Sequence, residues 1–303
     1  FEKHARPGGI LRYGIPDFKL EKWVLDQMRA EGVAFETGVV VGDDVSMRYL
    51  VRKFDAVLLA VGAEQPRDLT IPGRGLEGIH FAMDFLLQQN RRVAAEEVPD
   101  EGAIWAAGKK VVVVGGGDTG SDCVGTARRQ GATHITQIEL LPEPPDERPT
   151  ECPWPAWPTV KRTSSSHEEG CERLWSVLTK EFIGHGGIDV HGLRCVRIDW
   201  SEPDAEGKRT FEEVPDSEFH LEADLVLLAL GFVHVRHGAM VTEAGLATDE
   251  RGNLEVDARG MTSRDGVFAA SDCVHGASLV VRAIDAGRRA AEHIDEYLRS
   301  NGE

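Results

Sequence analysis

The sequence has little of what a nucleic-acid-binding or membrane-embedded protein requires. Lys and Arg number 34 against 51 Asp and Glu, so the formal charge is 34 − 51 = −17, and no long Lys/Arg run occurs. DNA, RNA and anionic membranes attract clustered positive charge. The longest relevant apolar run, residues 225–232, is strand-sized and far below the roughly 18 residues of a membrane helix. We therefore expect no nucleic-acid partner and no contact with a membrane.

The sequence also lacks paired cysteines. Its five cysteines include no Cys-x-x-Cys pair. An odd number of distant cysteines is typical of reduced thiols in the cytoplasm, and the spacing typical of zinc or iron–sulfur ligands is missing. The N-terminus shows no export signal and no initiator Met. We expect a cytoplasmic chain without a metal site, and an N-terminally truncated form of a longer protein.

Strand-like and helix-like segments alternate in what is present. The 303 residues correspond to about two domains. Continuous apolar runs predict buried strands at 54–61, 110–114, 134–140, 224–230 and 266–270. Amphipathic periodicity predicts helices at 19–30, 121–130, 168–182 and 278–298. Such alternation is typical of an α/β fold with mainly parallel sheets.

An apolar run followed by Ala-x-Gly occurs twice, ending at Gly62 and Gly231. Each copy closes a predicted strand at a glycine where the chain could pass from one domain to another. The simplest partition is a domain interrupted by an insertion. We expect a first segment over residues 1–75, an inserted domain over 76–232, and a second segment of the first domain over 233–303.

The strongest motif follows the predicted strand at 110–114 and opens a helix. It reads GGGDTG, which satisfies G-x-G-x-x-G in the context of a dinucleotide-binding turn. Gly115 allows the tight turn, Gly117 lets a diphosphate approach the backbone, and Gly120 permits close packing of helix on strand. Asp118 and Thr119 complete the turn, and the helix N-terminus attracts the phosphates. The motif predicts binding of NADH or NADPH.

The choice between NADH and NADPH stays open. Glu139 ends the next predicted strand, where an acidic side chain usually holds the ribose 2′-hydroxyl and favours NADH. Basic side chains could instead meet the 2′-phosphate of NADPH. Arg128 and Arg129 lie on the preceding helix, and Arg148, Lys161 and Arg162 follow the strand.

A second candidate site follows the strand at 266–270. Asp272 comes directly after it, in position to accept hydrogen bonds from a sugar-like chain, and a long helix starts near Ser278. The positive end of that helix suits an anionic reduced flavin. The alternative is that Asp272 only caps a turn.

Several stretches together resemble the small (beta) subunit of glutamate synthase. They are GGILRYGIPDFK at 8–19, the strand and glycine turn up to residue 124, RTSSSHEEG at 162–170, and SLVV at 278–281. The likeness covers essentially the whole chain. It implies two interleaved Rossmann-like domains of the pyridine nucleotide-disulfide oxidoreductase type, one for FAD and one for NAD(P)H. It further implies hydride transfer from the nicotinamide to FAD, and electron transfer through iron–sulfur clusters to a large subunit that makes glutamate from glutamine and 2-oxoglutarate.

The resemblance also assigns residues. The acidic residue that binds the adenosine ribose of FAD corresponds to Glu2. The segment under the flavin corresponds to Gly8, Gly9 and Leu11. Asp272 matches the residue on the ribityl chain, and Ser278 with Leu279 matches the helix start beside the flavin ring. No acid–base residue is needed, because the cofactors carry the chemistry, so we assign no catalytic residue, and His167 is not expected to act as a base.

The sequence departs from the family in what precedes Glu2. The first FAD strand, its glycine turn and the cluster-binding cysteines are absent, so iron–sulfur clusters are expected only in a missing N-terminal region. Ser271 also replaces the usual Gly. Two alternatives remain: a related NAD(P)H:ferredoxin- or sulfide-type oxidoreductase subunit, or a non-catalytic NAD(P)H-binding fragment that cannot hold FAD.

Two further segments carry structural expectations. Ser165 with Glu168, or Ser166 with Glu169, is predicted to form a capping box for the helix at 168–182. The proline-rich segment at 142–166 cannot form a regular helix or a central strand, and is expected to be a surface loop held by two tryptophans or a contact for a partner or cofactor.

Overall fold

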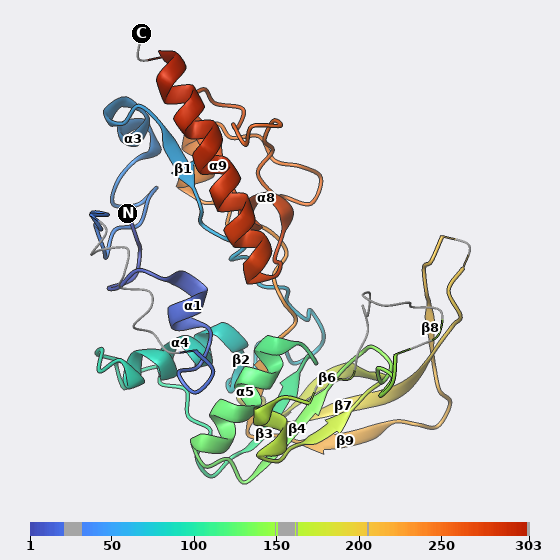
Figure 1. Cartoon of the computed structure of the whole chain (residues 1–303). Helices are drawn as coiled ribbons and strands as arrows, with labels where there is room; N and C mark the ends of the chain where they lie inside the picture. The colour runs from blue at the N-terminus through green and yellow to red at the C-terminus, as the bar shows by residue number, and fades with distance from the viewer. Residues whose placement is uncertain (21–31, 149, 151–160, 162, 205, 302–303) are drawn as a thin grey trace. The chain divides into compact units, whose positions relative to one another are not determined.

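The computed structural model describes residues 1–20, 32–148, 150, 161, 163–204 and 206–301. The chain divides into two compact units, each described by itself (Figure 1). The first unit comprises Phe1–Gly9, Trp23–Arg67 and Gly231–Glu303, and the second comprises Ile10–Lys22 and Asp68–Leu230. The second unit is thus inserted into the first, and it also includes a short segment from near the N-terminus.

A five-stranded parallel sheet forms the centre of the second unit, in the order β2-β10-β3-β4-β5. Its strands are β2 (Ile79–Phe81), β3 (Lys110–Val114), β4 (His134–Ile138), β5 (Glu172–Leu174) and β10 (Leu225–Leu228). The central strand β3 is paired on both sides, with Val112 opposite Val226 and Thr136. Parallel pairing places the carboxyl ends of all five strands at one edge, where ligands of open α/β sheets bind.

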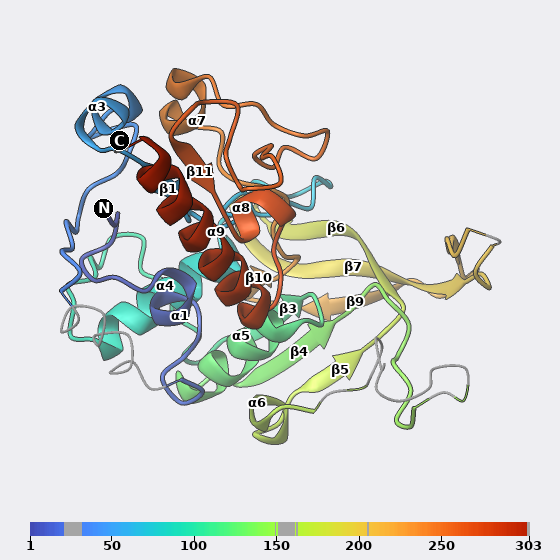
Figure 2. The ribbon, with the colours of Figure 1, turned by 45° about the horizontal axis from the view of Figure 1, so that its top comes forward.

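Both faces of this sheet are covered, which explains why its strands are continuously apolar. Alternate residues of β3 and β10 face the helices α4 (Ala82–Val93) and α5 (Asp118–Arg129), where Val111, Val113 and Leu225 are fully buried. The remaining ones, such as Val112 and Val226, face the antiparallel sheet. Figure 2 shows α5 lying along β3 and β4.

The antiparallel sheet consists of β6 (Val177–His185), β7 (Asp189–Trp200), β8 (Phe211–Glu213) and β9 (Phe219–Glu222). Strand β7 pairs with the other three. Alternate residues of this sheet, including Phe182, Leu193 and Cys195, are buried against the parallel sheet. The short helices α1 (Gly9–Tyr13) and α6 (Ser165–Glu168) complete the elements described outside the first unit.

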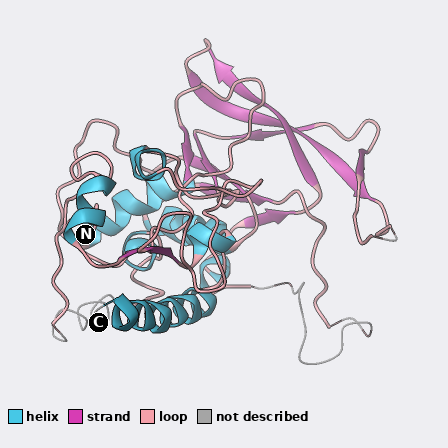
Figure 3. Cartoon of the chain, turned by 90° about the horizontal axis from the view of Figure 1, so that it is seen from above, coloured by secondary structure: helices cyan, strands magenta, loops and turns pink. Residues whose placement is uncertain are grey.

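The first unit contains a two-stranded parallel sheet of β1 (Val57–Leu59) and β11 (Val267–Ala269). The helices described within it are α3 (Met47–Lys53), α7 (Ala239–Ala244), α8 (Asp272–His275) and α9 (Val280–Asn301). Met47, Leu59, Val267 and Cys273 belong to its core. The long helix α9, which ends at the C-terminus in Figure 3, is joined to β11 by an edge-on contact between Tyr297 and Phe268.

The predicted helix at 168–182 is wrong. Strands β5 and β6 occupy this segment, and Ser176 between them has φ +53°, a conformation that a helix interior does not accommodate. Tertiary pairing overrides the helix-like apolar spacing, because β6 finds its partner in β7, later in the chain.

The predicted capping box is also shifted. Ser164 and His167 form it, and it opens the four-residue helix α6. The imidazole of His167 accepts the backbone N–H of Ser164, the role that the prediction gave to a carboxylate.

The other predicted elements agree with the structure where it describes them. The strands at 54–61, 110–114, 134–140, 224–230 and 266–270 contain β1, β3, β4, β10 and β11, and α5 and α9 lie close to their predicted ranges. Most of the predicted helix at 19–30 lies outside the described residues, as do the two tryptophans of the proline-rich segment. Among the helices that the structure describes, none is long and apolar enough to cross a bilayer.

Candidate functional site

The glycine turn between β3 and α5 has the geometry of an anion-binding turn. Gly115 has φ +122°, and a Cβ there would lie 2.3 Å from the carbonyl oxygen of Ala229, so only glycine fits. Gly120 is equally constrained, because its Cβ would lie 2.3 Å from the carbonyl oxygen of Gly115. This close approach brings the first turn of α5 directly onto the end of β3.

Gly117 differs from its neighbours because it faces open space. It has φ −75°, an ordinary value, and a Cβ there would meet no heavy atom within 4 Å. Gly117 and Asp118 are exposed, and Thr119 is half-buried. No described side chain caps α5, so the first backbone N–H groups of the helix remain available to a ligand. Unpaired helix N–H groups beside open space are the usual cradle for a phosphate.

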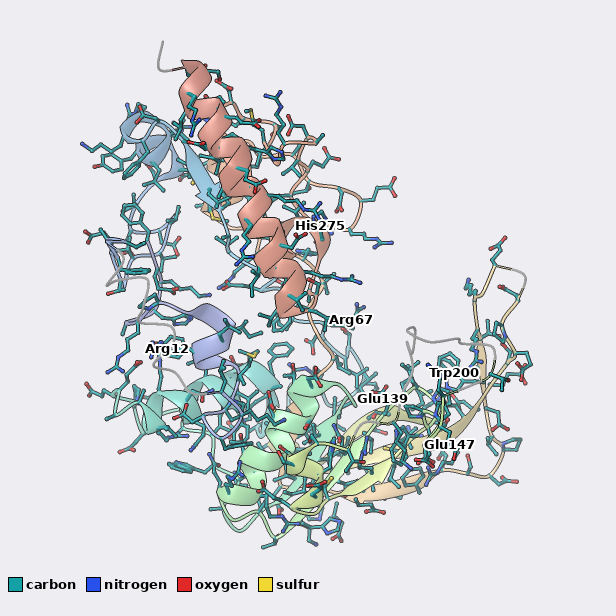
Figure 4. The ribbon with its side chains drawn as sticks, viewed as in Figure 1. Arg12, Arg67, Glu139, Glu147, Trp200 and His275 are labelled. Atoms are coloured by element: carbon teal, nitrogen blue, oxygen red, sulfur yellow. The ribbon has the colours of Figure 1, made fainter. Side chains whose placement is uncertain are left out.

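Glu139 lies beside this turn. It follows β4 directly and is labelled in Figure 4. One carboxylate oxygen accepts the N–H of Gly116 and the other accepts the N–H of Leu141 at 3.1 Å. The loop that continues from it is held by Trp200, whose indole N–H donates to the carbonyl of Leu140 at 3.0 Å. An acidic side chain therefore lies at the carboxyl end of β4, next to the glycine turn.

Arg128 is not brought to the glycine turn. It lies in the last turn of α5, about 15 Å along the axis from Asp118 at 1.5 Å per residue. Its guanidinium donates to the carbonyl of Gly170. Arg129 forms an ion pair with Glu169 at 2.6 Å and stacks on the ring of Phe18.

The basic side chains after β4 are partly accounted for. Lys161 is paired with Glu143, with its nitrogen 2.5 Å from the carboxylate oxygen, and with Asp146. Arg162 lies outside the described residues. Among the predicted ribose-contacting side chains, Glu139 contacts the turn directly, through the N–H of Gly116.

In the first unit, Asp272 and Ser278 lie together. Asp272 opens α8 directly after β11, and its carboxylate accepts the hydroxyl of Ser278 at 2.9 Å. Leu279 follows and is 58% exposed just before α9 begins. Ser271, at the cap of α8, has φ +73° and ψ −144°, a region that favours glycine. The hydrogen bond between Asp272 and Ser278 joins the end of the strand to the start of the long helix.

The remaining predicted residues lie near the N-terminus. Glu2 forms a parallel bridge with Thr37, and its carboxylate accepts the N–H of His4 at 2.9 Å. Gly8 and Gly9 both have positive φ, and a Cβ on Gly9 would meet nothing within 4 Å. Leu11 is half-buried on α1 and belongs to the second unit.

No group of three or more metal-ligating side chains occurs among the described residues. Four of the cysteines are described, and all are free thiols. Burial raises the pKa of the Cys123 thiol well above its ordinary value and that of Cys195 to about 11. Thiols with such pKa values are protonated at neutral pH, which disfavours both nucleophilic reactivity and metal binding.

Sequence reasoning missed Gln137, a polar residue next to the turn, and considered His167 only as a base, without its contact with Gln137. Gln137 is 2% exposed on β4, and its side-chain N–H donates to the carbonyl of Gly115 at 2.8 Å. Its oxygen lies 2.9 Å from Nε2 of His167. The available signal was a long polar side chain inside a strand predicted to be buried, since buried polar groups require partners.

Comparison with known proteins agrees with this geometry. The family model of pyridine nucleotide-disulphide oxidoreductases matches residues 30–287. The glutamate synthase [NADPH] small chain of Mycobacterium tuberculosis H37Rv is 49% identical over 305 residues, which span 98% of this chain and 61% of that protein. A putative glutamate synthase [NADPH] small chain of Cereibacter sphaeroides is 38% identical over 98% of this chain and 70% of its own length.

A solved structure shares the fold. Mycobacterium tuberculosis FprA in complex with NADPH superposes with a TM-score of 0.70 at 19% identity, over 99% of this chain and 76% of that chain. The chain thus spans about three-fifths of the length of the M. tuberculosis small chain and about three-quarters of FprA. The chain belongs to the pyridine nucleotide-disulphide oxidoreductase family and, within it, to the glutamate synthase small chains.

Proposed function

We propose that this chain is part of an electron-input flavoprotein of the glutamate synthase type. It binds NADPH or NADH at the β3–α5 turn and delivers hydride to FAD. Electrons then pass through iron–sulfur clusters to a large subunit that forms glutamate from glutamine and 2-oxoglutarate. The single observation that supports this best is the open glycine turn at the free N-terminus of α5, in a chain 49% identical to a glutamate synthase small chain.

The residues of the turn fit a dinucleotide. The N–H groups at the start of α5, from Asp118 to Gly120, bind the diphosphate, and the open space at Gly117 admits it. Glu139 lies where the adenosine ribose of the nucleotide is expected. The chain's own role in the reaction is to bind and orient the nicotinamide nucleotide, because hydride transfer requires positioning and no proton-transferring side chain.

The residues of the first unit fit one end of FAD. The Asp272 carboxylate, held by Ser278, is suited to the hydroxyls of the ribityl chain, and the exposed Leu279 is suited to the edge of the flavin ring. When bound, FAD accepts two electrons as hydride and can release them singly. A strand, glycine turn and helix like β3–α5 does not occur among the described residues of this unit.

Partner and clusters belong to the proposal for the whole protein. The relatives named small chains imply a large-subunit partner. The iron–sulfur clusters are likewise part of that proposal for the whole protein, and no cluster of metal-ligating side chains occurs among the described residues. The second candidate function is a non-catalytic NAD(P)H-binding fragment, which the open glycine turn at the N-terminus of α5 would also support.

An absorbance spectrum after addition of FAD, with a parallel titration by NADPH and NADH, tests these proposals. A bound flavin spectrum that is bleached by NADPH or NADH supports the electron-input function. Nucleotide binding without any bound flavin supports the fragment. A chain that binds neither nucleotide refutes the assignment of the glycine turn. Reduction assays with and without a glutamate synthase large subunit then distinguish this function from a ferredoxin- or sulfide-linked one.

A further inference from the structure

The carbonyl of Gly115 is held from inside the second unit. Gln137 donates its side-chain N–H to that carbonyl at 2.8 Å, and the amide of Gln137 is almost completely buried. A buried side-chain amide that lacks a hydrogen-bond partner raises the free energy of the folded state. The side chain of Gln137 therefore keeps its N–H directed at Gly115 only while its oxygen also has a partner. That partner is Nε2 of His167 at 2.9 Å.

The hydrogen bonds of His167 fix the position of its proton. Its Nδ1 accepts the backbone N–H of Ser164 at 3.2 Å, so in the neutral ring the proton resides on Nε2. Nε2 then donates to the oxygen of Gln137, which leaves the amide nitrogen of Gln137 to donate to Gly115. Burial, and secondarily the positive charges of Arg173 and Lys19, lowers the pKa of His167 to about 4, so the ring is neutral at pH 7.

Holding the Gly115 carbonyl orients the N–H on the other side of the same peptide bond. In a planar trans peptide the C=O and the following N–H point in opposite directions. The N–H of Gly116 is directed to the Glu139 carboxylate, and the next residue of the turn, Gly117, opens onto the free N–H groups of α5. The orientation of the Gly115–Gly116 peptide therefore determines the direction in which the backbone of the turn leaves β3.

We propose that Gln137 and His167 are positioning residues for nucleotide binding, which hold the Gly115–Gly116 peptide in the orientation that the diphosphate requires. Neither residue touches the ligand. This inference rests on the proposed function, because it assumes that the turn binds NADH or NADPH. It assigns a positioning role to the Ser/His segment at 164–167, which also opens α6 and is joined to α5 through the hydroxyls of Ser164 and Ser121.

Two substitutions of His167 separate positioning from capping. In His167→Asn, the side-chain oxygen lies near the position of the histidine Nδ1. It can still accept the Ser164 N–H, but the shorter side chain offers no donor to Gln137. His167→Gln reaches the place of Nε2 and restores that donor. We expect His167→Asn and Gln137→Leu each to weaken nucleotide binding about fivefold to tenfold, the equivalent of one neutral hydrogen bond. His167→Gln is expected to bind within about twofold of wild type, because the donor is retained.

A matched control uses another glutamine of the same unit. Gln130 accepts the N–H of Ala106 and donates to Gln89, both at 2.8 Å, at the far end of α5 from the turn. Gln130→Leu removes two hydrogen bonds of similar kind, and it is expected to lower the melting temperature without changing nucleotide affinity.

The experiment is calorimetric titration of the full chain and of the variants with NADPH and with NADH, with a melting curve for each. Weak binding by His167→Asn with recovery in His167→Gln supports the inference, whatever the melting temperatures. If wild type binds and His167→Asn binds equally well, the inference is refuted while the proposed function stands. If Gln130→Leu loses as much affinity as Gln137→Leu, the effect is one of stability alone, and the inference is again refuted. A wild-type chain that binds neither nucleotide refutes both the proposed function and this inference.

Discussion

Gly117 and Gly120, two glycines of the same turn, are expected to respond in opposite ways to an added side chain. At Gly120, an added Cβ would lie 2.3 Å from the Gly115 carbonyl oxygen and 2.6 Å from the buried Gln137 amide. Neither neighbour can move away freely, because the first is backbone and the second is hydrogen-bonded on both sides. At Gly117 the same Cβ would enter open space at an ordinary φ.

The magnitudes follow from these distances. Overpacking costs about 1–3 kcal/mol, and each kcal/mol lowers the melting temperature of a unit this size by about 2–4 °C. We therefore expect Gly120→Ala to lower it by about 2–12 °C. Gly117→Val loses only a favourable N-cap residue, worth up to about 1 kcal/mol. It nevertheless fills the diphosphate space, and losing one hydrogen bond to a charged phosphate weakens binding about tenfold to a hundredfold.

Thermal unfolding and nucleotide titration of the two variants provide the assay. The reasoning predicts a crossed result, in which Gly117→Val folds almost normally and binds NADPH or NADH poorly, and Gly120→Ala is the less stable of the two. Wild-type affinity in Gly117→Val would mean that the diphosphate does not pass over this glycine. A Gly117→Val variant less stable than Gly120→Ala would mean that the packing of α5 on β3 is not as tight as these contacts indicate.

Two other predictions concern stability. Ser271 occupies a backbone region that favours glycine, so Ser271→Gly is expected to raise the free energy of unfolding by about 1 kcal/mol in urea titrations, and a decrease would contradict the strain. Burial lowers the pKa of His167 from 6.5 to about 4, so the unfolded chain binds a proton at this residue more readily than the folded chain does. Protonation of His167 therefore lowers the free energy of unfolding as the pH falls from about 6.5 to about 4. Above pH 7 the residue has no such effect. His167→Gln is expected to reduce this pH dependence in melting curves between pH 4 and 7, and an unchanged slope would show that the ring is not buried neutral.

The parallel sheet was predictable because its strands are buried on both faces and are therefore apolar without interruption. The run of four valines before Gly115 and the run of Leu225–Leu228 have no polar interruption, which favours central strands of a parallel sheet. The glycine turn was predictable for a related reason, since positive φ at Gly115 and close approach at Gly120 each exclude a side chain. In both cases the requirement, for apolar residues in the strands and for glycine in the turn, falls on residues that are adjacent in the sequence, so a short stretch of sequence shows it.

The antiparallel sheet was not predictable in the same way. The apolar positions of β6 satisfy a helical spacing as well as a strand, and the choice depends on pairing with β7, which no local pattern reveals. The distance of Arg128 from the turn, in contrast, could have been predicted, because ten residues of helix after Asp118 carry it about 15 Å along the axis. Its contact with Gly170 depends on how the segment after β4 returns to α5.

Strand β4 and the residue after it provide the side chains that hold the glycine turn in place, which the GGGDTG motif itself does not contain. Gln137 and Glu139 lie two residues apart, the spacing that places side chains on one face of a strand. Gln137 holds the carbonyl of the Gly115–Gly116 peptide, and Glu139 accepts its N–H. The glycines make the turn possible because they lack side chains, and for the same reason they cannot fix its orientation by packing. The orientation must come from a neighbouring element, and the buried amide of Gln137 on β4 and the carboxylate of Glu139 directly after β4 supply it. A polar pair at this spacing, beside a glycine turn, is therefore a pattern by which sequence analysis could recognise a turn held in this way.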